Sequence, residues 1–353
     1  MRSTRGLGVS AGLVMAGLLA ACGAARGEPA GRATAGAGVR VASEAELRAA
    51  AARSERESVN IVIDSAITVR HGVYFPPSES IVRLTGVTPE ASLTFEMAYG
   101  SAAAARDHRE ENGLEFHCRQ AIVTGLTLHG YDKRGALLKG HTRELLYVGH
   151  CTFEGVGTRQ YPLAAAAARN AEETVCNHCI AAHELRQAHV SVVNCTFRRC
   201  ALSAQRWSHC VYVSARSVVV MGNKFDECGN PFSIGGSAPG ASVTVIGNEV
   251  SHPQATPGAD GRVHAAFMAS LTESDFAAYV GNRFAGRFET PWTGQPTAGL
   301  HWVDYNDYGA AAVAGPWGAH TGRGEWIGWE KWRSMGFDGH STPPRATEQP
   351  GNR

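Results

Sequence analysis

The sequence predicts an all-β protein: a single-stranded right-handed parallel β-helix, in which short strands coil and stack on one another. An apolar segment recurs along the chain at spacings of 25 residues or more, which is typical of a solenoid. Each copy alternates apolar and polar residues, as strands do. The copies are AIVTGLTL ending at Leu128, LYVGHCTF at Phe153, VSVVNCTF at Phe197, VVVMGNKF at Phe225, VTVIGNEV at Val250 and AAYVGNRF at Phe284.

A turn position lies two residues before each of these anchors. It reads Leu126, Cys151, Cys195, Asn223, Asn248 and Asn282 from the first copy to the last. Asparagines stacked in successive coils can hydrogen-bond to one another and to backbone groups at the turn. Leucine and cysteine fill the same position with apolar or soft groups. We therefore expect an inward asparagine ladder that gives way to sulfur and aliphatic side chains toward the N-terminus.

Each end of the β-helix is expected to carry a cap, because an open stack exposes unpaired strand edges. Ser43 provides N-cap chemistry for an alanine-rich helix that runs to Ala52. Near the other end, Trp326, Trp329 and Trp332 follow one another at intervals of three residues. On a helix this spacing gives one aromatic face, which would close the C-terminal end.

The N-terminus has the layout of a secretory signal: two arginines, then an apolar run that ends in Leu19-Ala20-Ala21-Cys22. This ending resembles the lipobox of bacterial lipoproteins, and an ordinary cleavage site with a chance cysteine is the alternative. We expect a signal peptide at 1–21, lipidation of Cys22, a flexible tether at 22–38, the β-helix with its caps at 39–341, and a disordered tail at 342–353.

At 353 residues and 44% apolar, the chain can bury the core of one large domain or of two ordinary ones. A formal net charge of +1 argues against a dedicated nucleic-acid binder. In an oxidising compartment disulfides persist, and neighbouring coils lie about 4.8 Å apart, within reach of a disulfide. The disulfide candidates are Cys151 with Cys195, Cys179 with Cys210, and Cys200 with Cys228.

Two alternatives for the cysteines stay open. Cys151 and Cys195 can equally be reduced thiols in the core, and Cys118 and Cys176 have no evident partner. A tetrahedral zinc site is the second alternative; its ligands would come from Cys176, His178, Cys179, His209 and Cys210. Disulfides are favoured in an exported protein, so we expect neither a metal nor a cofactor.

A second repeated register predicts the outward-facing side chains. Its copies are NGLEFH (112–117), RGALLK (134–139), HCIAAH (178–183), HCVYVS (209–214) and NPFSIG (230–235). Because side chains of a strand alternate between its faces, this alignment places His117, Lys139 and His183 on three successive coils. We expect these three residues to lie in one exposed column.

These residue types suit proton abstraction from a polyuronate. Such a reaction needs a base, which His or Lys supplies, and a cation that stabilises the negative charge as it develops. Tyr212, Arg216, Arg206 and Glu115 would assist the three column residues. A solvated polar face without chemistry is the alternative. The sequence has no clustered aspartates for calcium and no adjacent Asp-Asp pair for a two-carboxylate hydrolase.

The stretch SHCVYVS (208–214) followed by VVVMGNKF is similar to a pattern of right-handed parallel β-helix proteins in the pectate-lyase-like superfamily. The cap helix followed by IVID (61–64) and the closing WEKWRSMGFDGHS also resemble the two ends of that group. The resemblance covers roughly residues 40–341. It implies the fold far more strongly than an activity, because such scaffolds host lyases, hydrolases, epimerases, adhesins and proteins without catalysis.

Taken together, the sequence predicts an exported lipoprotein, anchored to the cell envelope through Cys22 alone, whose β-helix meets acidic polysaccharide. The first hypothesis is an enzyme of lyase or epimerase type. The alternative is a non-catalytic surface or adhesive protein that binds a glycan or another partner through the same face.

Overall fold

The computed structural model describes residues 38–97, 112–132, 135–158, 177–202, 208–236, 240–251, 276–288, 301–313, 318–321 and 325–344. The predicted signal peptide, the lipidation site Cys22 and most of the predicted tether and tail lie outside these residues, as do Cys176 and Arg206. In the part of the chain that is described, no helix is both long and apolar enough to span a bilayer.

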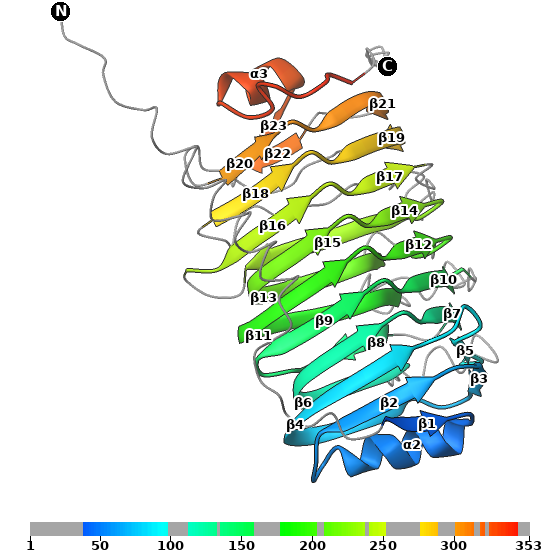
Figure 1. The fold of residues 1–353 in the computed structure, drawn as a ribbon. Helices are drawn as coiled ribbons and strands as arrows, with labels where there is room; N and C mark the ends of the chain where they lie inside the picture. Colours follow the sequence, from blue (N-terminus) through cyan, green and yellow to red (C-terminus); the bar gives the residue numbers. More distant parts are fainter. Residues whose placement is uncertain are drawn as a thin grey trace, which may run out of the picture. The chain divides into compact units, whose positions relative to one another are not determined.

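The protein is all-β, and its strands form two sheets of parallel strands (Figure 1). The larger sheet contains β1 (Val39–Val41), β2 (Val59–Ile63), β4 (Val73–Gly86), β6 (Leu114–Thr124), β8 (Gly135–Gly140), β9 (Leu145–Gly149), β11 (Asn177–Val193), β13 (His209–Met221), β15 (Asn230–Gly236), β16 (Ser242–Ile246), β18 (Phe276–Val280) and β20 (His301–Asp304). The smaller sheet contains β3 (Ala66–Val69), β5 (Ser92–Phe95), β7 (Thr127–Tyr131), β10 (Thr152–Val156), β12 (Thr196–Arg198), β14 (Lys224–Asp226), β17 (Glu249–Ser251), β19 (Arg283–Phe288) and β21 (Asp307–Val313).

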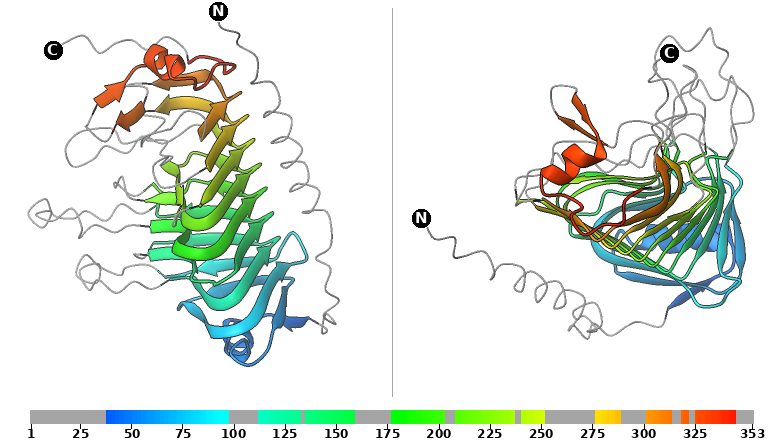
Figure 2. Two further views of the ribbon diagram at one scale, coloured as in Figure 1. Left: turned by 90° about the vertical axis from the view of Figure 1, so that its left-hand side faces the viewer. Right: turned by 90° about the horizontal axis from the view of Figure 1, so that it is seen from above.

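The chain alternates between the two sheets as it advances, and we call one passage through both sheets a rung. Successive rungs stack so that each strand pairs in parallel with its counterpart in the next rung, as the views in Figure 2 show. Parallel stacking of this kind is compatible with a parallel β-helix. The apolar core lies between the two sheets, since the buried side chains alternate with exposed ones along most strands.

The predicted anchor residues are confirmed as one column of the smaller sheet. Leu128 pairs with Phe153, Phe153 with Phe197, Phe197 with Phe225, Phe225 with Val250, and Val250 with Phe284. The rings stack directly, with centroids 4.9 Å apart between Phe153 and Phe197 and 4.7 Å apart between Phe197 and Phe225. Burial of each such side chain stabilises the fold by about 1.5–3 kcal/mol.

The turn that precedes each anchor explains the glycines in the repeat. The residue before the turn position has a positive φ in seven rungs: Gly125, His150, Asn194, Gly222, Gly247, Gly281 and Tyr305. This left-handed conformation redirects the chain from the larger sheet into the smaller one. Glycine adopts it without the steric cost that a Cβ imposes.

The predicted asparagine ladder is confirmed. Asn223 Nδ2 donates to Asn248 Oδ1 at 2.9 Å, and Asn248 Nδ2 donates to Asn282 Oδ1 at 2.9 Å. The ladder then continues beyond the predicted copies, because Asn282 Nδ2 donates to Asn306 Oδ1 at 3.0 Å and Asn306 Nδ2 to Asp338 Oδ1 at 3.1 Å. All five side chains are nearly inaccessible to solvent, so these bonds satisfy polar groups that water cannot reach.

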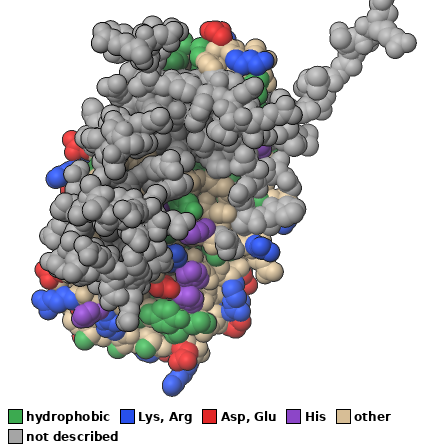
Figure 3. All heavy atoms as spheres, turned by 180° about the vertical axis from the view of Figure 1, so that it is seen from behind, with side chains coloured by type: hydrophobic (Ala, Val, Ile, Leu, Met, Phe, Trp, Pro, Cys, Tyr) green, Lys and Arg blue, Asp and Glu red, His purple; other side chains and the backbone are tan. Residues whose placement is uncertain are grey.

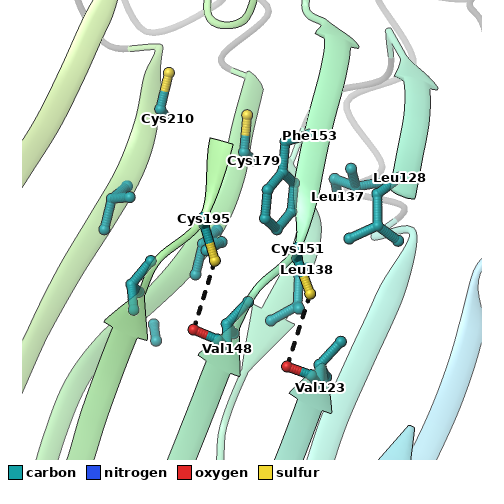
Figure 4. Packing of buried hydrophobic residues seen from close by; sticks show 14 of the residues in the cluster. Val123, Leu128, Leu137, Leu138, Val148, Cys151, Phe153, Cys179, Cys195 and Cys210 are labelled. Carbon is teal, nitrogen blue, oxygen red and sulfur yellow. Dashed lines mark hydrogen bonds between the residues drawn. The ribbon is translucent and has the colours of Figure 1, made fainter. Parts of the chain in front are cut away.

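Two cysteines continue this column with thiols. Cys151 Sγ lies 3.7 Å from the carbonyl oxygen of Val123, and Cys195 Sγ lies 3.6 Å from that of Val148 (Figure 4). Asn223 makes the equivalent bond to the Val192 carbonyl through Nδ2, at 2.9 Å. The thiols therefore donate to the same backbone position as the amides, although more weakly.

The N-terminal helix is found where the sequence predicts it. Helix α2 (Glu44–Arg53) begins after Ser43, whose side chain accepts a bond from the Glu46 backbone N–H at 3.3 Å. Glu46 Oε2 in turn accepts from the backbone N–H of Ala42, the residue before the N-cap, at 2.7 Å, an arrangement close to a capping box.

The predicted C-terminal helix is found, but it contains only two of the three tryptophans. Helix α3 (Trp329–Ser334) contains Trp329 and Trp332, and Trp332 is fully buried. Trp326 instead lies in β23 (Glu325–Ile327), which pairs antiparallel with β22 (Gly318–Thr321). A helix that included Trp326 is therefore wrong, because Gly328, in extended conformation, forms the N-cap of α3.

The seven cysteines within the described residues are buried free thiols. Cys200 lies opposite Cys228, since the neighbouring pair Arg198 and Asp226 is in register and Gly229 N donates to Cys200 O. Cys179 likewise lies opposite Cys210 in β11 and β13, between the paired residues on either side (Figure 4). The structure thus places these predicted partners next to each other, and the disulfides themselves stay a prediction.

Candidate functional site

The outward-facing residues of β6, β8, β11 and β13 form the candidate site, with one correction to the predicted register. Leu114 pairs with Leu138, and Glu115 pairs with Lys139. Lys139 also pairs with Ala181 on the other side. The predicted alignment of RGALLK was therefore two residues out. That alignment placed Leu137 opposite Glu115, whereas Leu137 is fully buried in the core. Lys139 lies in the column of Glu115, and His141 takes the place beside His117 that we had predicted for Lys139.

The corrected arrangement gathers imidazoles on one face of the larger sheet, and Figure 3 shows histidine side chains clustered on one face of the molecule. The His117 and His141 rings stack with centroids 4.4 Å apart. Tyr74, from β4, covers the other side of His117 at 5.1 Å. We call this set the histidine face; it comprises Tyr74, Glu115, His117, Lys139, His141, His183 and Tyr212.

Glu115 is the centre of one half of the histidine face. Its Oε1 lies 2.7 Å from His117 Nε2 and 3.6 Å from His141 Nε2. Its other oxygen, Oε2, accepts a bond from Asn112 Nδ2 at 2.8 Å. Asn112 is itself fixed, because its Oδ1 accepts from the Ala136 backbone N–H at 3.0 Å. The carboxylate is thus held in place from the neighbouring rung before any ligand arrives.

The electrostatics of this half follow from the same contacts. Partial burial by itself would raise the pKa of Glu115, but hydrogen bonds from Asn112 and His117 and the adjacent imidazoles bring it below its usual value. Burial lowers the pKa of His141, repulsion between its protonated form and the basic groups of His117, Lys139 and His183 lowers it further, and Glu115 opposes these effects without cancelling them. At neutral pH a carboxylate therefore faces an imidazole that is mainly neutral.

Tyr212 is the centre of the other half. Its ring lies 4.4 Å from His183 in an edge contact and 4.8 Å from His178 in a stacked one. His178 is almost fully buried, and its Nδ1 accepts from the His209 backbone N–H at 3.2 Å. Burial and the neighbouring cations hold the pKa of His178 well below its usual range. His178 therefore supports Tyr212 from beneath, whereas His183 is partly exposed on the face.

Of the predicted site residues, the structure brings together His117, Lys139, His183 and Tyr212 on this face. Arg216 is exposed, and its guanidinium lies against Gly240, where an added Cβ would come within 3.3 Å of Nη2. Cys179 and Cys210, two of the proposed zinc ligands, are buried in the core.

Sequence reasoning missed His141, Asn112 and Tyr74. His141 lies two residues after Lys139 in the stretch LLKGH, so the period-two alternation of a strand pointed to it. The signal was obscured because RGALLK can be aligned with its neighbours in two registers that differ by two residues. Both registers place Leu138 on the inside, because a shift of two residues preserves the alternation.

The histidine face combines groups suited to two kinds of chemistry. Imidazole and amine groups next to one another can move protons and stabilise an anion. Glu115, His117 and His141 can also hold a metal ion, because their ligand atoms all lie within 4.8 Å of one another. Comparison with protein-family models, with curated proteins and with solved structures finds no match for this chain.

Proposed function

We propose that the protein is an exported lipoprotein, anchored through Cys22, that binds acidic polysaccharide on the histidine face and cleaves it by β-elimination. The fold in this proposal is a right-handed parallel β-helix of the pectate-lyase-like superfamily, with a cap at each end. One observation carries the proposed activity. Lys139 and the partly exposed His183 lie on adjacent strands of one face, where Lys139 pairs with Ala181, two residues before His183.

In the proposed reaction His183 removes the proton at C5 of a uronate residue, next to its carboxylate. The Lys139 ammonium faces that carboxylate and stabilises the negative charge that develops there. The electron pair of the C–H bond forms the C4=C5 double bond, the C4–O bond to the next sugar breaks, and the leaving oxygen takes a proton from the Tyr212 hydroxyl. We assign proton abstraction to His183 because Glu115 engages the two other imidazoles of the face, His117 and His141.

The spacing of the face suits an extended polymer. Tyr74 and Tyr212 lie on β4 and β13, and three strands of the larger sheet, β6, β8 and β11, separate them in the stacking order. Stacked strands are about 4.8 Å apart. A chain of several sugar units can therefore lie along the rungs, with an aromatic ring near each end and Lys139 between them.

The test is a screen of the purified full chain against alginate, pectate and glycosaminoglycans, measuring the ultraviolet absorbance of the unsaturated product. With the substrate that responds, His183→Ala should lower kcat by about 10²–10⁴-fold, the contribution typical of a general base. His129→Ala is the matched control, because His129 is a partly exposed histidine of the smaller sheet, in β7. Its activity should equal that of the unaltered protein.

The same screen separates the alternative function. Retention of the protein by an immobilised polysaccharide without any product would support a non-catalytic binding protein and overturn the enzymatic step. If the protein shows no retention and forms no product with any of these polymers, the whole proposal is overturned.

A further inference from the structure

We propose that Glu115, His117 and His141 form a binding site for a divalent transition-metal ion. The three ligand atoms come from two neighbouring rungs and lie within 4.8 Å of one another. Two imidazoles and a carboxylate are a donor set that suits zinc and other first-row divalent ions rather than calcium or magnesium, which prefer oxygen ligands alone.

The distances indicate a site that closes with small side-chain movements. The His117 Nε2 and His141 Nε2 atoms lie 2.7 Å and 3.6 Å from the same carboxylate oxygen. Zinc binds imidazole nitrogen and carboxylate oxygen at about 2.0–2.2 Å, so ligand atoms around one ion lie somewhat more than 3 Å apart. The ion would take the place of the Glu115–His117 hydrogen bond, with both atoms as ligands.

The surroundings of the three residues are those of a supported site. Asn112 is buried and holds the second Glu115 oxygen, which fixes the carboxylate as an outer partner does in a metal site. Tyr74 packs against His117 and restricts its ring. Each of the three side chains is about a quarter to two-fifths exposed, with fractions of 25%, 26% and 38% for His117, Glu115 and His141, so an ion can enter from solvent and keep a coordination position open to it.

A second histidine–glutamate pair provides an internal comparison. His129 Nδ1 lies 3.6 Å from Glu154 Oε2 on the smaller sheet, with side chains exposed to a similar degree. Among the residues that the structure describes, no third ligand atom joins that pair. The difference between the two places is therefore the third ligand, His141, and the support from Asn112.

The experiment is calorimetric titration of the purified, EDTA-treated full chain with Zn²⁺ in the absence of polysaccharide. We expect one ion per chain. His117→Ala and His141→Ala should each weaken binding at least as much as loss of an outer-shell partner does, about 10–100-fold. His129→Ala should leave the affinity unchanged. Visible absorption of Co²⁺, added in place of Zn²⁺, gives a second readout of ligand number, and circular dichroism shows that each variant is folded.

Absence of Zn²⁺ binding to the unaltered protein would overturn the inference. It would also be overturned if His117→Ala and His141→Ala bound Zn²⁺ as tightly as the unaltered protein does. Loss of binding in His129→Ala would overturn it as well, because the ion would then lie on the other sheet. None of these outcomes depends on polysaccharide turnover. Failure of the proposed function and failure of this inference are therefore seen in separate measurements.

Discussion

Asp338 is a buried carboxylate that ends the asparagine ladder. Its oxygens accept bonds from four side chains: Asn306, Tyr308, Trp332 and Ser341. Burial raises the pKa of Asp338, and these four donors lower it without cancelling the effect of burial. The residue has a φ of 51°, a conformation that asparagine also tolerates.

This raised pKa predicts how stability depends on pH. Because the folded protein holds the Asp338 proton at pH values where the unfolded chain has lost it, the contribution of Asp338 to the free energy of unfolding falls as pH rises from its ordinary pKa to its raised one. Asp338→Asn removes that titration. Urea unfolding of both proteins across this range should show the unaltered protein losing stability relative to the variant as pH rises. A constant difference would contradict the assignment.

At the scale of elements, the left-handed turn residues determine how the chain passes between the sheets. Gly125 and Gly247 occupy the same turn position, with φ values of 68° and 61°. A Cβ added to Gly247 would meet nothing within 4 Å, whereas one added to Gly125 would lie 2.6 Å from the Gly86 carbonyl oxygen. The two glycines thus separate the cost of the conformation from the cost of a clash.

Gly247→Ala should lower the free energy of unfolding by about 1–2 kcal/mol, the cost of a left-handed alanine. Gly125→Ala should lower it further, because backbone would have to move. His150→Gly, at the exposed turn of another rung, should raise it by up to about 1 kcal/mol by removing the same strain. Denaturant unfolding of the three variants measures their free energies of unfolding and so checks this ranking. Equal losses for the two alanine variants would contradict the role of the Gly86 contact.

The elements also show what the sequence could predict. The anchors and the asparagine column were predictable because Phe197 and Phe225, or Asn223 and Asn248, recur at one offset with a turn residue before them. Strand β8 was not predictable in register, since its first four residues are all buried and give no alternation. The identity of the candidate site depends on that register, so His141 was missed while Lys139 was placed one column away. The end of the ladder at Asp338 was missed because no repeat surrounds it.

At the scale of the whole molecule, the cysteines connect rungs through the interior. Burial raises the pKa of Cys118 to about 11 and that of Cys179, Cys210 and Cys228 well above the usual range. Thiols in this state react slowly within the folded protein. Any disulfide between such groups would therefore form during folding, when neighbouring rungs first come together.

Peptide mapping without reduction, on protein purified from an oxidising compartment, should yield a Cys200–Cys228 link and a Cys179–Cys210 link. These are the partners that lie opposite one another in adjacent rungs. A reduced sample provides the control. A Cys176–Cys200 link would contradict the stacking on which these assignments depend.

The asparagine ladder has a direction. Each amide from Asn223 to Asn306 donates toward the C-terminus, and Asp338 at the end only accepts. In an interior rung the asparagine accepts one amide hydrogen bond from the rung before it and donates one to the rung after it. A whole rung could therefore be gained or lost during evolution without changing the bonds of the others. The two ends lack this freedom, because one must supply a backbone donor, as Cys195 does, and the other a side chain that accepts the last bond, as Asp338 does. The number of rungs in such a protein can thus change, whereas the residue that ends the ladder cannot.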